Sequence, residues 1–164
     1  MSSNLFDMTN KVALITGSSK GIGRAIAEEM VRQGAKVVIS SRKADVCQEV
    51  ADAINAEAKA SGNQTGEAIV IPAHVGQREA LQHLVDETRA RLGQIDVLVC
   101  NAAVNPFYGS MQELPDDAMD KILDINSKSN HWLVNMVLPE MIERKDGAII
   151  IVSSVGGLRG SPVL

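Results

Sequence analysis

The sequence predicts an α/β fold in which helices cover both faces of a doubly wound parallel sheet. Five apolar runs of strand length recur at residues 12–16, 36–40, 68–72, 95–100 and 148–152, and helical periodicity fills the gaps between them. The runs are rich in Val and Ile and apolar along their whole length, as expected for strands covered on both faces. This alternation predicts a Rossmann-like sheet within one domain over residues 1–164.

The first two predicted helices cover 21–33 and 44–60. The first has apolar residues at the spacing of a buried helix face, namely Ile22, Ala25, Ile26 and Met30, and it stops at Gly34. The second is rich in Ala and ends in the polar loop 61–66. Both helices are expected to pack on the sheet.

Two further helical regions cover 78–92 and 115–144. The first closes on Gly93, and the second is long and is expected to be interrupted at Pro139. The apolar stripe predicted for the second region consists of Met119, Ile122, Leu123, Trp132, Leu133, Met136, Val137 and Met141.

A glycine-rich turn joins the first predicted strand to the first predicted helix. It reads Thr16-Gly17-Ser18-Ser19-Lys20-Gly21-Ile22-Gly23 and directly follows Val12-Ala13-Leu14-Ile15. Such a turn aims backbone N–H groups and the positive end of a helix dipole at one point, which suits a phosphate. The P-loop alternative requires a Lys followed by Ser or Thr after the last glycine, whereas Arg24-Ala25 follows here. The turn therefore favours a dinucleotide over a nucleoside triphosphate.

The end of the second predicted strand indicates which dinucleotide is bound. It reads Ile39-Ser40-Ser41-Arg42-Lys43, with no carboxylate before Asp45. A fold that prefers NAD usually places Asp or Glu there, whereas a 2′-phosphate requires cations. Arg42, with Lys43 or Lys20, predicts NADP(H). The alternative is that Arg42 and Lys43 are solvated residues at a helix start, a place that electrostatically disfavours cations.

Composition excludes several other classes of partner and site. Hydrophobic residues make up 45% and charged residues 22% of the 164 residues, and the net charge of −4 comes without a basic stripe, so neither nucleic acid nor an anionic membrane is expected. No apolar run has the length of a bilayer span, and residues 1–10 are polar, which predicts a cytoplasmic protein. His74, His83 and His131 lie on different elements, so no metal site is expected.

The two cysteines, Cys47 and Cys100, lack metal or disulfide spacing. A reduced compartment fits them, and Cys100 is expected to be a small buried side chain at a strand end.

The chain resembles the short-chain dehydrogenase/reductase family through four motifs in the same order. They are the T-G-x-x-x-G-x-G turn at 16–23, Cys100-Asn101-Ala102-Ala103, Asp124-Ile125-Asn126, and the segment Ile151-Val152-Ser153-Ser154-Val155-Gly156-Gly157. Ser41-Arg42-Lys43, His74-Val75-Gly76 and residues 101–107 look most like the NADP-dependent carbonyl and retinol reductases. Two departures are His74-Val75 where many members have Asp-Val, and Ala103 or Val104 where a glycine is usual.

The resemblance implies the roles of individual residues. Catalytic roles fall to Ser154, which steadies the substrate oxygen, and Asn126, which serves the proton relay. The expected cofactor-binding residues are Gly17, Ser18, Ser19, Lys20, Gly21, Ile22, Gly23, Ser41, Arg42, Lys43, His74, Val75, Asn101, Ala102 and Ala103. Small carbonyl or alcohol substrates and a homodimer or homotetramer are implied.

The family's Tyr-x-x-x-Lys is expected beyond Leu164. Tyr108 has Gln112, not Lys, at its fourth following position, so it is expected on the rim of the substrate pocket or in an exposed loop. The chain is therefore expected to be the N-terminal part of a longer domain, with C-terminal strands and helices missing. The alternatives are a noncatalytic dinucleotide-binding module, an inactive truncated fragment, and a subunit-interaction piece.

Overall fold

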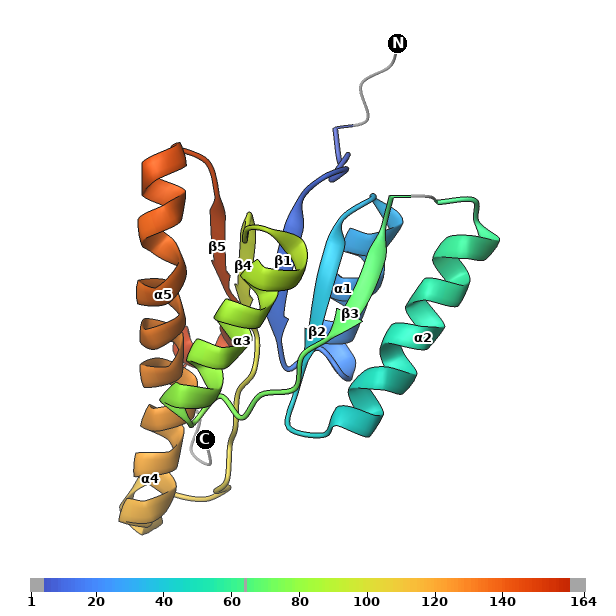
Figure 1. Ribbon diagram of the computed structural model, residues 1–164. Coiled ribbons are helices and arrows are strands. Elements are labelled where there is room, and N and C mark those ends of the chain that lie inside the picture. The colour runs from blue at the N-terminus through green and yellow to red at the C-terminus, as the bar shows by residue number, and fades with distance from the viewer. Residues whose placement is uncertain (1–4, 64, 160–164) are drawn as a thin grey trace.

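The computed structural model describes residues 5–63 and 65–159, which form a five-stranded parallel sheet (Figure 1). In chain order the strands are β1 (Val12–Thr16), β2 (Lys36–Ser40), β3 (Glu67–Val70), β4 (Val97–Cys100) and β5 (Ala148–Ile151). Their order across the sheet is β3-β2-β1-β4-β5, and every neighbouring pair is parallel. The sheet therefore grows outward from β1 in both directions, which confirms the doubly wound, Rossmann-like prediction.

Helices cover both faces of this sheet. Figure 1 shows α1 (Gly21–Arg32) and α2 (Ala44–Ala60) on one side, with α3 (Arg78–Leu92) and α5 (Ser129–Arg144) on the other. Each face of the sheet has its own hydrophobic core, and successive residues of β1 point into opposite cores. Ile15 packs with Ala27 and Ile54, whereas Leu14 packs with Leu84 and Leu133. This two-sided burial explains the continuous apolar strands in the sequence.

Three predicted strands are shorter than expected, and β5 is shorter by one residue because it ends at Ile151. β3 ends at Val70, although the chain beyond it still pairs with β2: Ile71 N–H donates to the Ile39 carbonyl at 3.2 Å. β4 begins at Val97, although the backbone of Asp96 still bonds to both neighbouring strands, its N–H to the Val12 carbonyl and its carbonyl to the Ala148 N–H, both at 2.9 Å. The buried Asp96 carboxylate accepts the Val12 N–H at 2.8 Å and so ties the start of β4 to the start of β1.

The prediction for the buried face of α1 is partly wrong. Ile22 is 63% exposed and Ala25 is also exposed, whereas Gly23, Ala27 and Val31 form the buried face. The close packing of Gly23 against the preceding turn sets the rotation of the helix. Ile22 therefore points away from the core.

The helical region predicted at 115–144 is irregular at a different place from the one expected. α5 runs through Pro139 to Arg144, so the expected interruption at Pro139 is wrong. The irregularity lies earlier, where a π-helical segment, Asp124–Lys128, joins α4 (Asp116–Leu123) to α5. A π segment arises from one extra residue per turn, which an apolar stripe does not reveal.

The buried stripe of this region also differs from the predicted one. Met119 and Leu123 are exposed on α4. The buried positions recur every four residues through the π segment and α5, and they are Ile125, Ser129, Leu133, Val137 and Met141.

β5 is the outer strand of the described sheet. Its side chains are largely exposed, with Ile150 at 44% and Ile151 at 56%. Its register with β4 pairs Cys100 with Ile151, so the segments that follow these two strands leave the sheet at the same edge.

Candidate cofactor site

The glycine turn between β1 and α1 has the tight geometry that the sequence predicts. Gly17 has φ +66° and Gly21 has φ +57°, a left-handed conformation that costs a residue with a Cβ about 1–2 kcal/mol. A Cβ on Gly23 would lie 2.5 Å from Asn101 Nδ2 and 2.6 Å from the Gly17 carbonyl oxygen, whereas a Cβ on Gly21 would meet open space. Gly23 therefore packs the turn together, and Gly21 leaves its outer side accessible.

The segment after β4 holds this turn in place. Asn101 donates from Nδ2 to the carbonyls of Thr16 and Gly17 at 3.0 and 3.2 Å. The Thr16 hydroxyl accepts the N–H groups of Asn101 and Ala102 at 3.0 and 3.1 Å. Asn101 thus holds the turn through hydrogen bonds to its backbone. Its main partner is Thr16, which was not among the predicted site residues. The signal in the sequence was a Thr placed between a buried strand and the first glycine.

Ser18 differs from its predicted role. Its side chain is fully buried, donates to the Ile15 carbonyl at 2.8 Å and accepts the Ser40 N–H at 2.8 Å. Its own N–H donates to the Ser40 carbonyl at 3.2 Å. Ser18 therefore joins the ends of β1 and β2, and neither its hydroxyl nor its N–H is free to contact a phosphate.

The first turn of α1 is open to an anion. Its N-cap residue, Lys20, has an extended backbone and makes no side-chain cap. The helix thus begins without an internal acceptor for its first N–H groups, and Lys20, Gly21 and Ile22 are exposed around them. Ser19, half-buried, lies between this exposed group and Ser18.

The end of β2 carries the other predicted cations. Arg42 and Lys43 are exposed, and together with Lys20 they take part in none of the ion pairs among the described residues. Ser41 is half-buried, with its hydroxyl 3.1 Å from the Cys47 thiol. β1 and β2 pair in register, Thr16 with Ser40, so these cations and the glycine turn leave the same edge of the sheet.

His74 and Val75 follow β3 at this same edge. Ala73 N–H donates to the Ser41 carbonyl at 3.1 Å, which places His74 directly beyond the end of β2. His74 Nδ1 accepts the Gly76 N–H at 3.1 Å, and both His74 and Val75 are half-buried.

The predicted catalytic residues lie after β5 and in the π segment. Ser154 is exposed, its Oγ accepts the Gly156 N–H at 3.1 Å, and its hydroxyl proton has no acceptor among the described residues. Asn126 is held by the loop after β4: its Oδ1 accepts the Val104 N–H at 2.8 Å, and its Nδ2 donates to the Val104 carbonyl at 2.9 Å. Val104 is therefore a second site residue that sequence reasoning missed.

The remaining residues of the segment after β4 vary in exposure. Ala102 is half-buried, Ala103 is exposed, and Tyr108 is 73% exposed, as expected for a loop residue. Cys100 is buried as predicted, and burial raises the pKa of its thiol to about 11. Cys100 is therefore no nucleophile at neutral pH.

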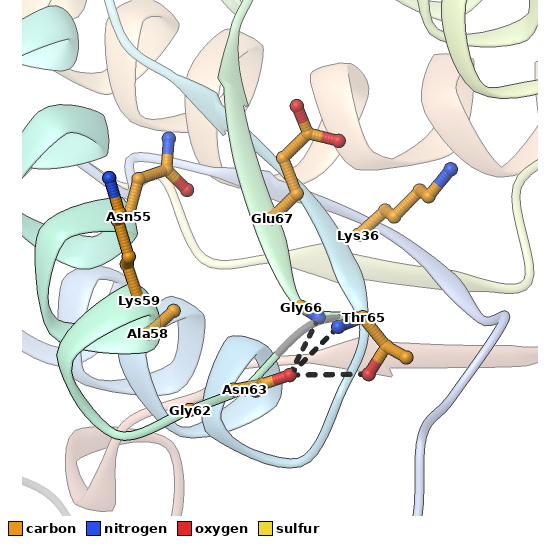
Figure 2. A pocket seen from close by; sticks show the side chains of 9 residues that line it. All are labelled: Lys36, Asn55, Ala58, Lys59, Gly62, Asn63, Thr65, Gly66 and Glu67. Atoms are coloured by element: carbon orange, nitrogen blue, oxygen red, sulfur yellow. Dashed lines mark hydrogen bonds between the residues drawn. The ribbon is translucent and has the colours of Figure 1, made fainter.

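A hollow of about 710 Å³ lies at the opposite, amino edge of the sheet, where Lys36 begins β2 and Glu67 begins β3 (Figure 2). The side chains that line it shape the backbone: Asn63 Oδ1 accepts the N–H groups of Thr65 and Gly66, both at 3.0 Å. Asn55 donates from Nδ2 to the Ala68 carbonyl and accepts the Ala68 N–H at Oδ1, both at 2.8 Å. This hollow is remote from the glycine turn and carries no residue of the predicted site.

The described residues hold no group of three or more His, Cys, Asp and Glu side chains arranged for a metal ion. Within the same residues, no helix has the length and apolar character needed to cross a bilayer.

Comparisons with known proteins agree with this geometry. The model of the short chain dehydrogenase family matches residues 11–164. A curated relative, "Dehydrogenase/reductase SDR family member 4" of Bos taurus, is 41% identical over 157 residues, which cover 96% of this chain and 54% of the relative. The chain thus spans about half the length of the curated relatives it matches.

Two solved structures share the fold. A metagenomic short-chain oxidoreductase in complex with NADP has a TM-score of 0.85 at 31% identity, covering 94% of this chain and 67% of that one. An alcohol dehydrogenase from the archaeon Thermococcus sibiricus, complexed with 5-hydroxy-NADP, has a TM-score of 0.82 at 25% identity, covering 93% of this chain and 61% of that one. With the family model matching nearly its whole length, this chain belongs to the short-chain dehydrogenase/reductase family.

Proposed function

We propose that the protein binds NADP(H) at the carboxyl edge of its sheet and takes part in hydride transfer between this cofactor and a small carbonyl or alcohol. The observation that carries the proposal is the combination of an uncapped helix start after the glycine turn with Lys20, Arg42 and Lys43, three exposed cations outside the ion pairs of the described residues. The family binds nicotinamide cofactors, and the preference for NADP is the part that needs a test.

The glycine turn fits a pyrophosphate. The space beside Gly21 admits close approach to the backbone, because no atom lies within 4 Å of the position a Cβ would occupy. The N–H groups of the first turn of α1 then face the phosphate oxygens, and the helix dipole favours their charge.

The end of β2 suits a 2′-phosphate better than a free ribose hydroxyl. Arg42 offers a planar guanidinium that can donate two parallel hydrogen bonds, and Lys20 or Lys43 adds a point charge. The nearest carboxylate along the chain, Asp45, lies inside the first turn of α2, where its charge suits the helix dipole. The NADP complexes of the two solved structures support this choice by analogy.

The bound cofactor would supply the hydride. The chain's own residues would position the substrate oxygen, which gains or loses a proton. Ser154 can donate its hydroxyl proton to that oxygen, because the bond from the Gly156 N–H uses a lone pair of Oγ and not the O–H. Asn126 fixes the loop beside the site through Val104. We propose that the general acid comes from the part of the domain that the relatives have and this chain does not span.

The experiment compares NADPH and NADH in fluorescence titrations of the full-length natural protein. We expect tighter binding of NADPH, and a loss of about tenfold for NADPH alone in Arg42→Ala, since a charge-assisted bond contributes about 1.5–3 kcal/mol. The matched control is Lys36→Ala, which removes a cation at the other end of β2. Equal affinity for NADH in the wild-type protein would contradict the proposed preference.

A noncatalytic NADP(H)-binding module is the second candidate. Tyr108, which is exposed and has Gln112 at its fourth following position, does not form a Tyr-x-x-x-Lys pair. Tight NADPH binding without oxidation of NADPH by any of a panel of aldehydes and ketones would select this candidate. Turnover that is lost in Ser154→Ala would select the enzyme.

A further inference from the structure

We infer that Asn55 and Arg91 seal the open edge of the sheet at β3 and so prevent this edge from pairing with a second copy of the chain. The order β3-β2-β1-β4-β5 leaves β3 with a neighbouring strand on one side only. An unpaired edge presents a row of backbone N–H and C=O groups to which another strand can add. The inference concerns how copies of the chain assemble, and it does not rest on the proposed NADP(H) site.

The hydrogen bonds toward β2 show which backbone groups of β3 point outward. The N–H groups of Glu67 and Ile71 donate to carbonyls on the β2 side, at 3.1 and 3.2 Å. Alternate residues of a parallel strand bond to the same neighbour, so Ile69, which lies between them, also faces β2. The backbone groups of Ala68 and Val70 therefore face the open side of the sheet.

Asn55, which lies on α2 beside β3 (Figure 2), covers both outward groups of Ala68. Its Nδ2 donates to the Ala68 carbonyl and its Oδ1 accepts the Ala68 N–H, both at 2.8 Å. A residue on an added antiparallel strand would make the same pair of bonds with its own N–H and C=O groups. The side-chain amide therefore takes the place that an added strand would need.

The position of Asn55 in its helix supports this role. It interrupts the Ala-rich residues 51–60 of α2, where Asn forms a helix less readily than Ala does. The helix packs against β3, and Asn55 is half-buried. The bonds to the strand edge offset the weaker helix propensity.

Arg91 covers the next outward carbonyl. It lies in the last turn of α3, and its Nη1 donates to the Val70 carbonyl at 3.0 Å. Of the outward groups of Ala68 and Val70, the Val70 N–H is the one that neither side chain covers. A single donor cannot support a ladder of paired bonds.

The outer strand at the other end of the sheet differs in this respect. In the part of the chain that the structure describes, no side chain bonds to the backbone of β5. The seal is therefore particular to β3.

Hydrogen exchange in the full-length natural protein tests the seal without any substitution. The amides of Ala68 and Val70 point to the same side, and Asn55 accepts the first of them. After correction for intrinsic rates, we expect the Ala68 amide to exchange more slowly than the Val70 amide by about fivefold or more. A smaller difference would overturn the inference.

The matched variants are Asn55→Ala and Asn63→Ala, compared by light scattering at high micromolar concentration. Each removes an amide that bonds to the backbone, but Asn63 serves the loop before β3 and not the strand edge. We expect Asn55→Ala to form species of about twice the wild-type mass through paired β3 edges. Asn63→Ala should keep the wild-type mass.

A second substitution separates edge pairing from a simple loss of stability. Val70→Pro removes the donor that bonds to neither Asn55 nor Arg91, and it places a ring on the open side of the strand. Asn55→Ala/Val70→Pro should therefore return to the wild-type mass, even where it is less stable than Asn55→Ala.

Three scattering results would also overturn the inference: the wild-type mass in Asn55→Ala, equal association of Asn63→Ala, or undiminished association of the double variant. If Asn55→Ala does not fold, the exchange ratio in the wild-type protein still decides.

Discussion

Gly21 and Gly23 lie two residues apart in the same turn, and a Cβ at each would have a different effect. In Gly23→Ala the new methyl group would overlap Asn101 and the Gly17 carbonyl, so we expect a fall of about 2–4 kcal/mol in the free energy of unfolding together with lost NADPH binding. In Gly21→Ala the methyl group meets no protein atom, and only the left-handed backbone costs about 1–2 kcal/mol. Urea denaturation and NADPH titration of both variants separate the effects: Gly21→Ala should lose far more binding than stability.

The two cysteines give a second prediction for single residues. Burial raises the pKa of Cys100 to about 11, and Cys47 is fully buried, so neither thiol should react with iodoacetamide at pH 8 in the folded protein. Both should react in urea, as intact-mass measurement would show. The raised pKa of Cys100 also means that its contribution to stability is complete below its ordinary value of 9.0 and declines as the pH rises toward 11. Rapid labelling of Cys100 in the native protein would contradict its burial.

The π segment joins two elements through a single side chain. Asn126 donates to and accepts from the backbone of Val104, so two hydrogen bonds tie the π segment to the loop after β4. Asn126→Asp keeps an acceptor for the Val104 N–H and places a second oxygen against the Val104 carbonyl. We expect a loss of about 1–3 kcal/mol in the free energy of unfolding at pH 7.

The same variant has a pH signature. Below the pKa of the introduced carboxyl the protonated acid can donate to the Val104 carbonyl, so the loss should shrink as the pH falls toward 4. The matched control is Asn135→Asp on α5, where the exposed amide bonds to the His131 ring and to no other group in the described part of the chain. An equal and pH-independent loss of unfolding free energy in both variants would show that the bonds to Val104 do not contribute to stability.

At the level of elements, the sequence predicted the helices and strands well because hydrophobic periodicity is a local signal. The bounds of α2 and α3 match their predictions, and so do those of β1 and β2. The π segment and the passage of α5 through Pro139 were missed, since both depend on how one long helix packs across the sheet. Pro139 is exposed, and the strong packing of Leu133, Val137 and Met141 on either side of it keeps the helix continuous.

At the scale of the whole molecule, the exposed apolar side chains of α4 support the prediction of a homodimer or homotetramer. Met119 and Leu123 are one helical turn apart, and both are exposed on the same side of α4. Light scattering of the full-length protein at micromolar concentration should show an oligomer. Leu123→Lys should shift it toward a smaller species, whereas Glu49→Lys on the exposed face of α2 should not. A wild-type monomer would refute the prediction.

The sequence by itself determined the fold class, the position of the glycine turn and which cations lie at the same edge of the sheet. Each of these depends on neighbours within a few residues: strand periodicity, glycine spacing and the missing carboxylate before Asp45. The tertiary structure decided which of these groups are free to act. The Ser18 hydroxyl is bonded to the Ser40 N–H at the end of β2. Thr16 and Asn101, which are 85 positions apart, hold the turn together. Likewise, the Gly76 N–H occupies Nδ1 of His74. Hydrogen bonds between distant segments satisfy some polar groups and leave others open, and only the folded chain brings those segments together.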